Sequence, residues 1–286
     1  MRIALVGYGY WGPHYARICN ELANVELIAI CDIDPKQRAH ARLQHPGVPV
    51  FSSIYDAKNA EAVIVSTPAS THCHIAWTLL RRGHHVLLEK PMALDVYECE
   101  LLRDLATQNN LVLGVGHTFL YNEGIRQMKQ DIHDSSFGQI LYVHSTRTNP
   151  GPVRKDVDVL WDLAPHDVSI FNFLLEKQPR MVSAVGTKDV AFITLSYPNV
   201  LANIRVSWID PIKVRNVVAV GTGRKIIHND LHPRNEPLKE QLLDFLGAIK
   251  EKRALVSDGL VGEQVVKALV AAQASMKAGG APQAIQ

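Results

Sequence analysis

Two short segments of this chain carry side chains that could move protons. Glu89-Lys90-Pro91 closes the apolar run His84–Leu88, and Trp161–Asp167 follows in the second half of the chain. In a nucleotide-binding sheet, ligands bind beyond the carboxyl ends of the strands. If His84–Leu88 is such a strand, Lys90 lies at that edge, where a charged side chain is placed for catalysis.

The chemistry that suits these groups is hydride transfer from an alcohol. A hydride leaves an alcohol carbon only as the hydroxyl proton is removed, so the site needs a base and a group that stabilises the developing alkoxide. His166 is the expected base, and Lys90 is expected to donate to the same oxygen. Asp162 lies one helical turn before His166, close enough to orient the imidazole or to contact a sugar hydroxyl. Without Lys90, His166 would fit a structural role equally well, and Asp162 would fit a helix cap.

Pro165 predicts where the helix that carries His166 begins. Proline is tolerated in a helix only within the first turn, so we expect the helix through Asp167–Leu175 to begin close to Asp162 or Leu163. The positive end of a helix that starts there disfavours an imidazolium. We therefore expect His166 to be neutral and able to accept a proton.

A glycine pattern near the start of the chain predicts a dinucleotide site. Gly7-x-Gly9-x-x-Gly12 directly follows an expected strand and opens an expected helix. In that setting the pattern is a specific signal. Gly7 permits the tight turn, Gly9 lets the backbone approach the pyrophosphate, and Gly12 lets the helix pack closely on the strand. The phosphates would lie at the helix N-terminus.

Asp32 indicates which dinucleotide binds. It closes the second expected strand, where a carboxylate accepts hydrogen bonds from the adenosine ribose. The same charge repels a 2′-phosphate, so NAD is favoured over NADP. A simple role in a turn or a helix cap is the alternative for Asp32.

A second polar loop follows the expected strand Ala62–Ser66. Thr67-Pro68-x-x-Thr71-His72 lies at the same edge of the sheet and could line the nicotinamide half of the cleft. A loop in which Thr71 caps the next helix is the alternative, and both roles can hold together. His72 and His74 have a spacing that some metal sites use, but no carboxylate or cysteine partner is evident, so no metal is expected.

Composition excludes several other classes of protein. The 286 residues suggest about two domains, and 47% hydrophobic with 20% charged residues is ordinary for a globular protein. The formal net charge of +2 is spread along the chain, which indicates neither nucleic-acid nor membrane binding. No apolar stretch approaches a membrane span, and the chain starts directly with a strand and no signal peptide. We expect a soluble cytoplasmic protein whose partner is a small molecule. The four cysteines lack CxxC spacing and are expected to be buried apolar residues.

The first 120 or so residues alternate strands and helices, as a parallel sheet with crossover helices does. The expected strands are Arg2–Val6, Glu26–Cys31, Ala62–Ser66, His84–Leu88 and Leu111–Val115, and the expected helices are Trp11–Leu22, one starting at Asp34-Pro35, Thr71–Arg82, and one running from an Asp95 cap to about Gln108.

Beyond Gly116, long β-rich runs follow each other with few helices between, which predicts a mostly antiparallel sheet. The expected strands are Ile140–Thr148, Met181–Val185, Val190–Ser196, Leu201–Trp208, Val214–Val220 and Lys225–Ile227, and the expected helices are Leu163–Leu175, Glu236–Lys250 and Gly259–Lys277. The fold class is therefore α/β, with an N-terminal Rossmann domain at 1–118 and a C-terminal α+β domain with an open sheet at 119–286. The final helix is expected to pack back on the body of the protein.

Taken together, these motifs resemble the Gfo/Idh/MocA family of oxidoreductases. The matching elements are Gly7–Gly12, Thr67–His72, Glu89-Lys90-Pro91 and Asp162-x-x-x-His166-Asp167. The resemblance implies NAD(P)-dependent oxidation or reduction of a sugar or cyclitol CH–OH group, with Lys90 and His166 in the site. It also implies a cis peptide bond before Pro91. Tyr10, Trp11 and Glu89 complete the expected cofactor-binding residues, beside the three glycines, Asp32, Thr67, Pro68, His72 and Lys90.

A narrower resemblance is to the branch of that family that acts on nucleotide sugars, which includes UDP-N-acetylglucosamine and UDP-N-acetylglucosaminuronate 3-dehydrogenases. This narrower resemblance rests on residues 9–13, 116–122, 145–149, 161–167, 207–215 and 236–238. It implies that Tyr121, Asn122, Arg147 and Asn149 face the substrate. A helix start with a buried ring is the alternative for Tyr121 and Asn122, and a surface salt bridge is the alternative for Arg147. Compared with that branch, the chain is shorter between Gly186 and Asp189 and between Asp230 and Glu236.

Three functions follow from this resemblance. The first is oxidation at a sugar ring carbon, C3 of a nucleotide sugar; the second is the reverse reaction, a 3-ketosugar reductase in deoxysugar synthesis; the third is a non-catalytic NAD-binding regulatory protein. Val190–Ser196 and Leu201–Trp208 look apolar at both alternating sets of positions, which suits a sheet buried on both faces. We therefore expect a homodimer, or a higher homo-oligomer, formed by packing these sheets together.

Overall fold

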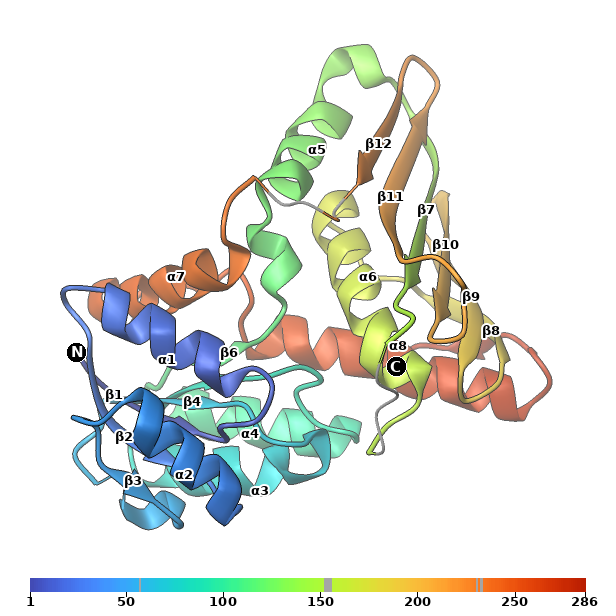
Figure 1. Ribbon diagram of the computed structural model, residues 1–286. Helices are drawn as coiled ribbons and strands as arrows, with labels where there is room; N and C mark the ends of the chain where they lie inside the picture. Colours follow the sequence, from blue (N-terminus) through green and yellow to red (C-terminus); the bar gives the residue numbers. More distant parts are fainter. Residues whose placement is uncertain (57, 152–155, 230, 232–233) are drawn as a thin grey trace. The chain divides into compact units, whose positions relative to one another are not determined.

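The computed structural model describes residues 1–56, 58–151, 156–229, 231 and 234–286, which form two compact units. Unit 1 consists of Met1–Gly116 and Gln241–Gly262, and unit 2 consists of His117–Glu240 and Glu263–Gln286. Figure 1 shows the helices and strands of both. Each unit has its own sheet and is described separately.

Unit 1 is built on a six-stranded parallel sheet with the order β3-β2-β1-β4-β5-β6. The apolar runs that end at Val6, Val65 and Leu88 are buried on both faces, as the strands of such a sheet must be. Between β1 and β4 the strand order reverses, and a sheet of this kind binds its ligand at that point. The strands are β1 (Arg2–Val6), β2 (Glu26–Cys31), β3 (Val50–Phe51), β4 (Ala62–Val65), β5 (His85–Leu88) and β6 (Leu113–Val115).

Helices cover the sheet of unit 1 in two groups. One pair packs on β1, β2 and β3, and a second pair packs on β4, β5 and β6. Two helix starts that the sequence predicts are confirmed: Asp34 Oδ1 accepts from the N–H of Lys36, and Asp95 Oδ1 accepts from the N–H of Tyr97. The first pair is α1 (Gly12–Glu21) and α2 (Pro35–Gln44), and the second is α3 (His72–Arg81) and α4 (Val96–Gln108).

Residues from the C-terminal part of the chain complete unit 1. They comprise most of α7 (Pro237–Glu251) and the first turn of α8 (Gly259–Lys277). The Gln241 amide donates to the carbonyl of Val115 over 2.9 Å, and the N–H of Val115 donates to the carbonyl of Ser257 over 2.8 Å. These two hydrogen bonds pair the backbone carbonyl and N–H of Val115, in the edge strand β6, with groups of the same unit.

Unit 2 is built on a seven-stranded sheet with the order β12-β11-β7-β10-β9-β8-β13. The pair β7–β10 is parallel and the other pairs are antiparallel, so the predicted mostly antiparallel sheet is confirmed. A long helix, α6, packs on β7, β9 and β10 (Figure 1). The strands are β7 (Ile140–Thr148), β8 (Met181–Gly186), β9 (Val190–Tyr197), β10 (Val200–Ser207), β11 (Val214–Gly221), β12 (Lys225–Asn229) and β13 (Gln283–Ala284), and the helices are α5 (Glu123–His133), α6 (Val159–Leu175) and the rest of α8.

Helix α6 begins earlier than the sequence predicts. Its N-cap is Asp158, whose Oδ1 accepts from the N–H of Trp161 over 3.1 Å. Pro165 is therefore inside the helix, in its second turn, and the missing N–H leaves the carbonyl of Trp161 without its helical donor. The prediction of a start near Asp162 or Leu163 was wrong because the polar cap and the apolar packing of α6 outweigh that single lost bond.

This earlier start removes one argument about His166. The influence of a helix dipole falls off within the first turn, and His166 lies a full two turns into α6. The positive end of the helix therefore does not hold this imidazole neutral.

The sheet of unit 2 has one covered and one open face within the chain. Burial alternates strictly along β9 and in the first half of β10. The outward set includes Phe192 and Leu201, which are 47% and 57% exposed, but also Thr194 and Asn203. The expectation that both alternating sets are apolar was wrong, because these polar residues occupy the open face. Tyr142 and Val185 add exposed apolar area there.

Among the described residues, no helix combines the length and the apolar character that crossing a bilayer would require.

Candidate active site

The glycine loop after β1 has the geometry that a dinucleotide needs. Gly7 has a φ of +91°, and a Cβ there would lie 2.5 Å from the carbonyl oxygen of Ser66. A Cβ on Gly12 would lie 2.5 Å from the carbonyl oxygen of Gly7. Both positions are therefore restricted to glycine by the protein itself. A Cβ on Gly9 would meet no heavy atom of the described chain within 4 Å, so open space faces this residue and a phosphate can approach its backbone.

Asp32 lies half-buried directly after β2, and the backbone holds its carboxylate in place. Its Oδ2 accepts from the N–H of Tyr8 over 2.7 Å, and its Oδ1 accepts from the N–H of Asp34 over 2.8 Å. The turn role that the sequence left open is thus present. A carboxylate has about four lone-pair positions, so these two bonds leave acceptor capacity for a ribose.

Two aromatic residues project from the glycine loop. Tyr10 is 78% exposed and Trp11 is 40% exposed, and their rings meet edge to face with centroids 5.3 Å apart. Exposed aromatic rings beside a phosphate-binding turn give a cofactor apolar surface to lie against.

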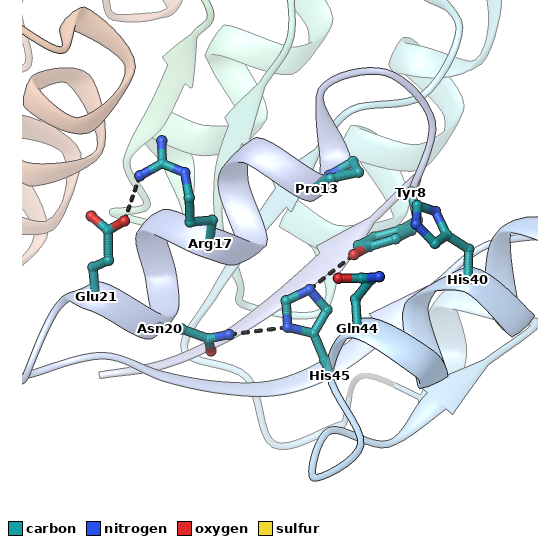
Figure 2. Close-up of a pocket in the computed structure, with 8 residues that line it drawn as sticks. All are labelled: Tyr8, Pro13, Arg17, Asn20, Glu21, His40, Gln44 and His45. Atoms are coloured by element: carbon teal, nitrogen blue, oxygen red, sulfur yellow. Dashed lines mark hydrogen bonds and ion pairs between the residues drawn. The ribbon is translucent and has the colours of Figure 1, made fainter.

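A pocket lies behind this loop, between α1 and α2 (Figure 2). Tyr8 Oη and His45 Nε2 are 2.9 Å apart, and His45 Nδ1 is 3.0 Å from the amide nitrogen of Asn20. Burial is the main cause that lowers the pKa of His45, and the nearby His40 lowers it further. Burial raises the pKa of Tyr8. The pocket measures about 530 Å³ and is lined by none of the residues that the sequence predicts for the site. These contacts support the loop from behind.

The loop after β4 is tied to itself and to Pro91. Thr71 Oγ1 donates to Thr67 Oγ1 over 2.8 Å. The Thr71 side chain makes no capping hydrogen bond at the start of α3, so the capping role that the sequence left open is absent. His72 is 1% exposed, with Nδ1 2.7 Å from the carbonyl oxygen of Pro91 and Nε2 2.9 Å from that of Thr67. Carbonyl oxygens only accept, so both bonds form together only when the ring carries two protons. His72 joins two turns of the site through its ring. Pro68, directly after Thr67, is exposed.

Glu89-Lys90-Pro91 begins directly after β5, at the carboxyl edge of the sheet, as the sequence predicts. The Lys90–Pro91 bond is cis, as the resemblance implies. Glu89 and Lys90 are each 7% exposed. Glu89 Oε1 accepts from the hydroxyl of Tyr15 over 2.8 Å, and its Oε2 accepts from the N–H of Lys90 over 3.2 Å.

Tyr15 and Gly116 fix the position of Glu89. Burial and the Glu89 carboxylate raise the pKa of Tyr15 well above its usual range, so its hydroxyl stays protonated and remains a donor. A Cβ on Gly116 would lie 2.9 Å from Glu89 Oε2. The backbone that carries Lys90 is thus held through its neighbour, and sequence reasoning assigned no role to Tyr15.

In unit 2, Asp162 and His166 are both half-buried and lie one turn apart on the same side of α6. Asp162 Oδ2 accepts from Trp208 Nε1 over 3.1 Å. The ring of His166 meets the ring of Phe119 edge to face, with centroids 4.7 Å apart and an interplanar angle of 74°. The proposed base therefore has an aromatic neighbour that sequence reasoning did not assign.

Arg147, on β7, makes a buried ion pair. Its Nε and Nη2 donate to Asp167 at 2.8 and 3.1 Å, and the two side chains are 3% and 0% exposed. The sequence left a surface salt bridge open for Arg147. The salt bridge is present, but it lies in the interior and not at the surface. Such a bidentate pair is geometrically fixed. The guanidinium carbon of Arg147 also lies 4.3 Å from the ring centroid of Phe119.

The other expected substrate residues surround the start of α5 and the end of β7. Tyr121 is fully buried, and Asn122 is the N-cap of α5, its Oδ1 accepting from the N–H groups of Gly124 and Ile125. The helix-start alternative is thus present at both. Asn149 is half-buried, and its N–H donates to the carbonyl of Ser207 over 2.9 Å.

Each unit therefore gathers one part of the expected site. Unit 1 brings the glycine loop, Asp32, the Thr67 turn and Lys90 to one edge of its sheet. Unit 2 brings Asp162, His166 and Arg147 together through Trp208 and Phe119.

Comparison with known proteins identifies the family. Residues 1–117 match the description "Oxidoreductase family, NAD-binding Rossmann fold", and residues 125–227 match the "GFO/IDH/MocA C-terminal domain". A solved structure from Magnetospirillum magnetotacticum MS-1, of a protein described as an oxidoreductase, is 30% identical. It has a TM-score of 0.86, with coverage of 95% of this chain and 99% of that chain. The chain belongs to the Gfo/Idh/MocA family.

Two further relatives of this Gfo/Idh/MocA protein cover nearly its full length. UDP-N-acetylglucosamine 3-dehydrogenase from Acidithiobacillus ferrooxidans is 27% identical, with coverage of 97% of this chain and 98% of the relative. The structure of GenD2 from gentamicin A biosynthesis in complex with NAD has a TM-score of 0.94 at 21% identity, with coverage of 100% and 96%. At that identity the likeness concerns the fold.

The predicted cofactor, NAD, is confirmed by the family description, which names an NAD-binding Rossmann fold. The residues present fit it, because open space faces Gly9 at the end of β1 and a fixed carboxylate, Asp32, stands at the end of β2. The predicted α/β fold and the predicted oxidoreductase activity are confirmed likewise.

Proposed function

We propose that this enzyme transfers a hydride between NAD and C3 of the sugar ring of a nucleotide sugar. The observation that carries the proposal is the similarity to the A. ferrooxidans UDP-N-acetylglucosamine 3-dehydrogenase, which extends over nearly the whole length of both proteins. Lys90, Asp162 and His166 supply the proton-handling groups that such a reaction needs.

The first 118 residues form the proposed NAD-binding domain. Gly7, Gly9 and Gly12 receive the pyrophosphate at the start of α1, and Asp32 accepts from the ribose. Tyr10 and Trp11 lie against the cofactor, Thr67 and Pro68 line its nicotinamide half, and His72 and Glu89 hold that edge in shape. When bound by these residues, NAD would supply the hydride acceptor.

Proton transfer is the task of the chain's own side chains. His166 takes the hydroxyl proton as the C–H bond breaks, and Lys90 donates a hydrogen bond to the oxygen as negative charge develops on it. Asp162, held by Trp208, orients the imidazole or accepts from a sugar hydroxyl. In the reverse direction the same groups return a proton to a ketone, so the geometry serves both directions.

Residues 119–286, apart from Gln241–Gly262 in unit 1, form the proposed substrate-binding and oligomerisation domain. Tyr121, Asn122 and Asn149 surround the proposed substrate site, and Arg147 supports it from the interior. The open face of the unit 2 sheet is the proposed subunit interface, because Tyr142, Phe192 and Leu201 expose apolar surface there.

A binding and turnover panel tests the proposal. The protein is screened by thermal shift with NAD plus UDP-, dTDP- and GDP-linked sugars, and the sugars that stabilise it are incubated with NAD while NADH absorbance is followed. Reduction of the product with borodeuteride, followed by mass spectrometry, locates the oxidised carbon. We expect a UDP-sugar to give the largest shift and deuterium at C3. NADH formation with free sugars alone, or deuterium elsewhere, would overturn the assignment; NAD binding without turnover of any sugar would favour a regulatory role.

A further inference from the structure

We propose that Phe119 is a positioning residue that holds the imidazole of His166 for proton transfer. The inference rests on the proposed function, because its expected effect on kcat presupposes turnover of a sugar. Phe119 lies in the short 3₁₀ turn Thr118–Tyr121, and its half-buried ring contacts groups from two other elements of unit 2. It touches the His166 ring at a centroid distance of 4.7 Å and the Arg147 guanidinium at 4.3 Å.

These contacts form a closed circuit that starts and ends on α6. Asp167 holds Arg147 by two hydrogen bonds, Arg147 lies over the ring of Phe119, and that ring meets His166, the residue next to Asp167. Because the ion pair is buried and bidentate, Arg147 has little freedom to move. The guanidinium therefore fixes the ring, and the ring restricts the imidazole.

The electrostatics of the ring suit this arrangement. An aromatic ring is negative on its face and positive at its edge, so a guanidinium over the face is attracted, and a second ring prefers an edge-to-face contact. Both preferences are met at Phe119. Arg215, which pairs with Arg147 in the β7–β11 register, places a second guanidinium carbon 6.0 Å from the same ring centroid.

Positioning is the role that this contact can serve, because His166 is half-buried and lies two turns into α6. A base must stand within hydrogen-bond reach of the proton that it removes. An aromatic neighbour held from behind by an ion pair supplies that constraint without touching the reacting atoms.

Phe119→Leu removes the aromatic contact while keeping an apolar side chain, and Phe119→Tyr restores the ring. We expect Phe119→Leu to lower kcat about 10- to 100-fold, the effect of misplacing a reacting group, with KM for the sugar and Kd for NAD within about threefold. Phe119→Tyr should recover most of kcat. Phe173→Leu is the matched control, because Phe173 lies on α6, the helix of His166, and like Phe119 has a cation near its ring, with Lys129 4.2 Å from the ring centroid.

A double-mutant cycle separates positioning from a general structural role. If Phe119 acts through His166, Phe119→Leu should have little further effect on kcat in a His166→Asn background. An equal loss in both backgrounds, or unchanged kcat in the single variant, overturns the proposal. If Phe119→Leu does not fold, Phe119→Met, with a flexible side chain that fills irregular space, replaces it in the same cycle.

NMR of the histidine ring signals gives a reading that needs no substrate. The ring current of Phe119 should displace the His166 signals in the wild-type protein, and Phe119→Leu should remove that displacement while Phe173→Leu leaves it. His166→Asn assigns the signals. Displaced signals in a protein that oxidises no sugar would mean that the proposed function fails while the contact stands. Signals unchanged by Phe119→Leu would overturn the positioning role whatever the substrate.

Discussion

The indole Nε1 of Trp208 donates to Oδ2 of Asp162 over 3.1 Å, which joins the end of β10 to the first turns of α6. Asp162 is half-buried one turn before His166, so the indole fixes a carboxylate on the same side of α6 as the proposed base. A residue from another element therefore takes part in placing Asp162.

Asp162→Asn should reduce kcat less than His166→Asn does. The amide keeps an oxygen that can accept from Trp208 and loses only the charge that orients the imidazole. Steady-state kinetics of both variants make the comparison, with Trp208→Phe as the variant that removes the donor instead. A loss for Asp162→Asn as large as that for His166→Asn would mean that the two residues act as one unit.

His166→Asn should lower kcat by about 10²–10⁴, the usual contribution of general acid–base catalysis. In the wild-type enzyme, the oxidation rate should fall on the acid side as the imidazole protonates, because a protonated ring cannot accept the hydroxyl proton. The pH profile of kcat/KM measures this limb in both proteins. If the limb is unchanged in His166→Asn, the base is Lys90, which must then be neutral in the complex.

Lys90→Met should abolish turnover while NAD affinity stays near normal. The methionine keeps much of the apolar stem but cannot donate to the substrate oxygen. Calorimetry measures NAD binding and absorbance at the NADH band measures turnover. Leu43→Glu on the exposed face of α2 serves as a surface control in the same unit. A Lys90→Met enzyme that keeps most of its activity would show that the oxygen is stabilised elsewhere.

Asp32→Ala should narrow the preference for NAD over NADP. Removing the carboxylate removes both its bonds to the ribose and its repulsion of a 2′-phosphate. Asp34→Ala is the matched control, because Asp34 caps α2 two residues away and its loss should cost stability without changing the preference. Titration of both cofactors by calorimetry decides this. Tighter binding of NADP than of NAD by the wild-type protein would contradict the role given to Asp32.

The open sheet of unit 2 should join two copies of the chain. Leu201→Glu places a charge beside Tyr142, its partner in the β7–β10 register, and should convert a dimer into monomers at micromolar concentration, as sedimentation velocity measures. Leu43→Glu, at a residue that is 76% exposed on α2, should leave the sedimentation coefficient unchanged. A wild-type protein that sediments as a monomer rules out this interface.

The sequence by itself determined the parts whose rules act over a few residues. The glycine loop, the Asp34 and Asp95 caps and the position of Lys90 after β5 all follow from strand patterns, helix starts and turn residues close in the chain. Six of the seven strands of unit 2 were also placed to within a few residues, while β13 was not predicted. The start of α6 was not, because Asp158 and apolar packing outweigh the preference of Pro165.

Only the tertiary structure decided what surrounds the proposed catalytic groups. Tyr15 reaches Glu89, Trp208 reaches Asp162, and Phe119 reaches His166, each from a distant segment of the chain. Arg147 finds Asp167 in the interior because β7 and α6 pack on each other. Such contacts depend on sheet register and on how helices cross strands, which no local pattern specifies. Local chemistry therefore names the reacting groups, and packing between remote elements selects their neighbours.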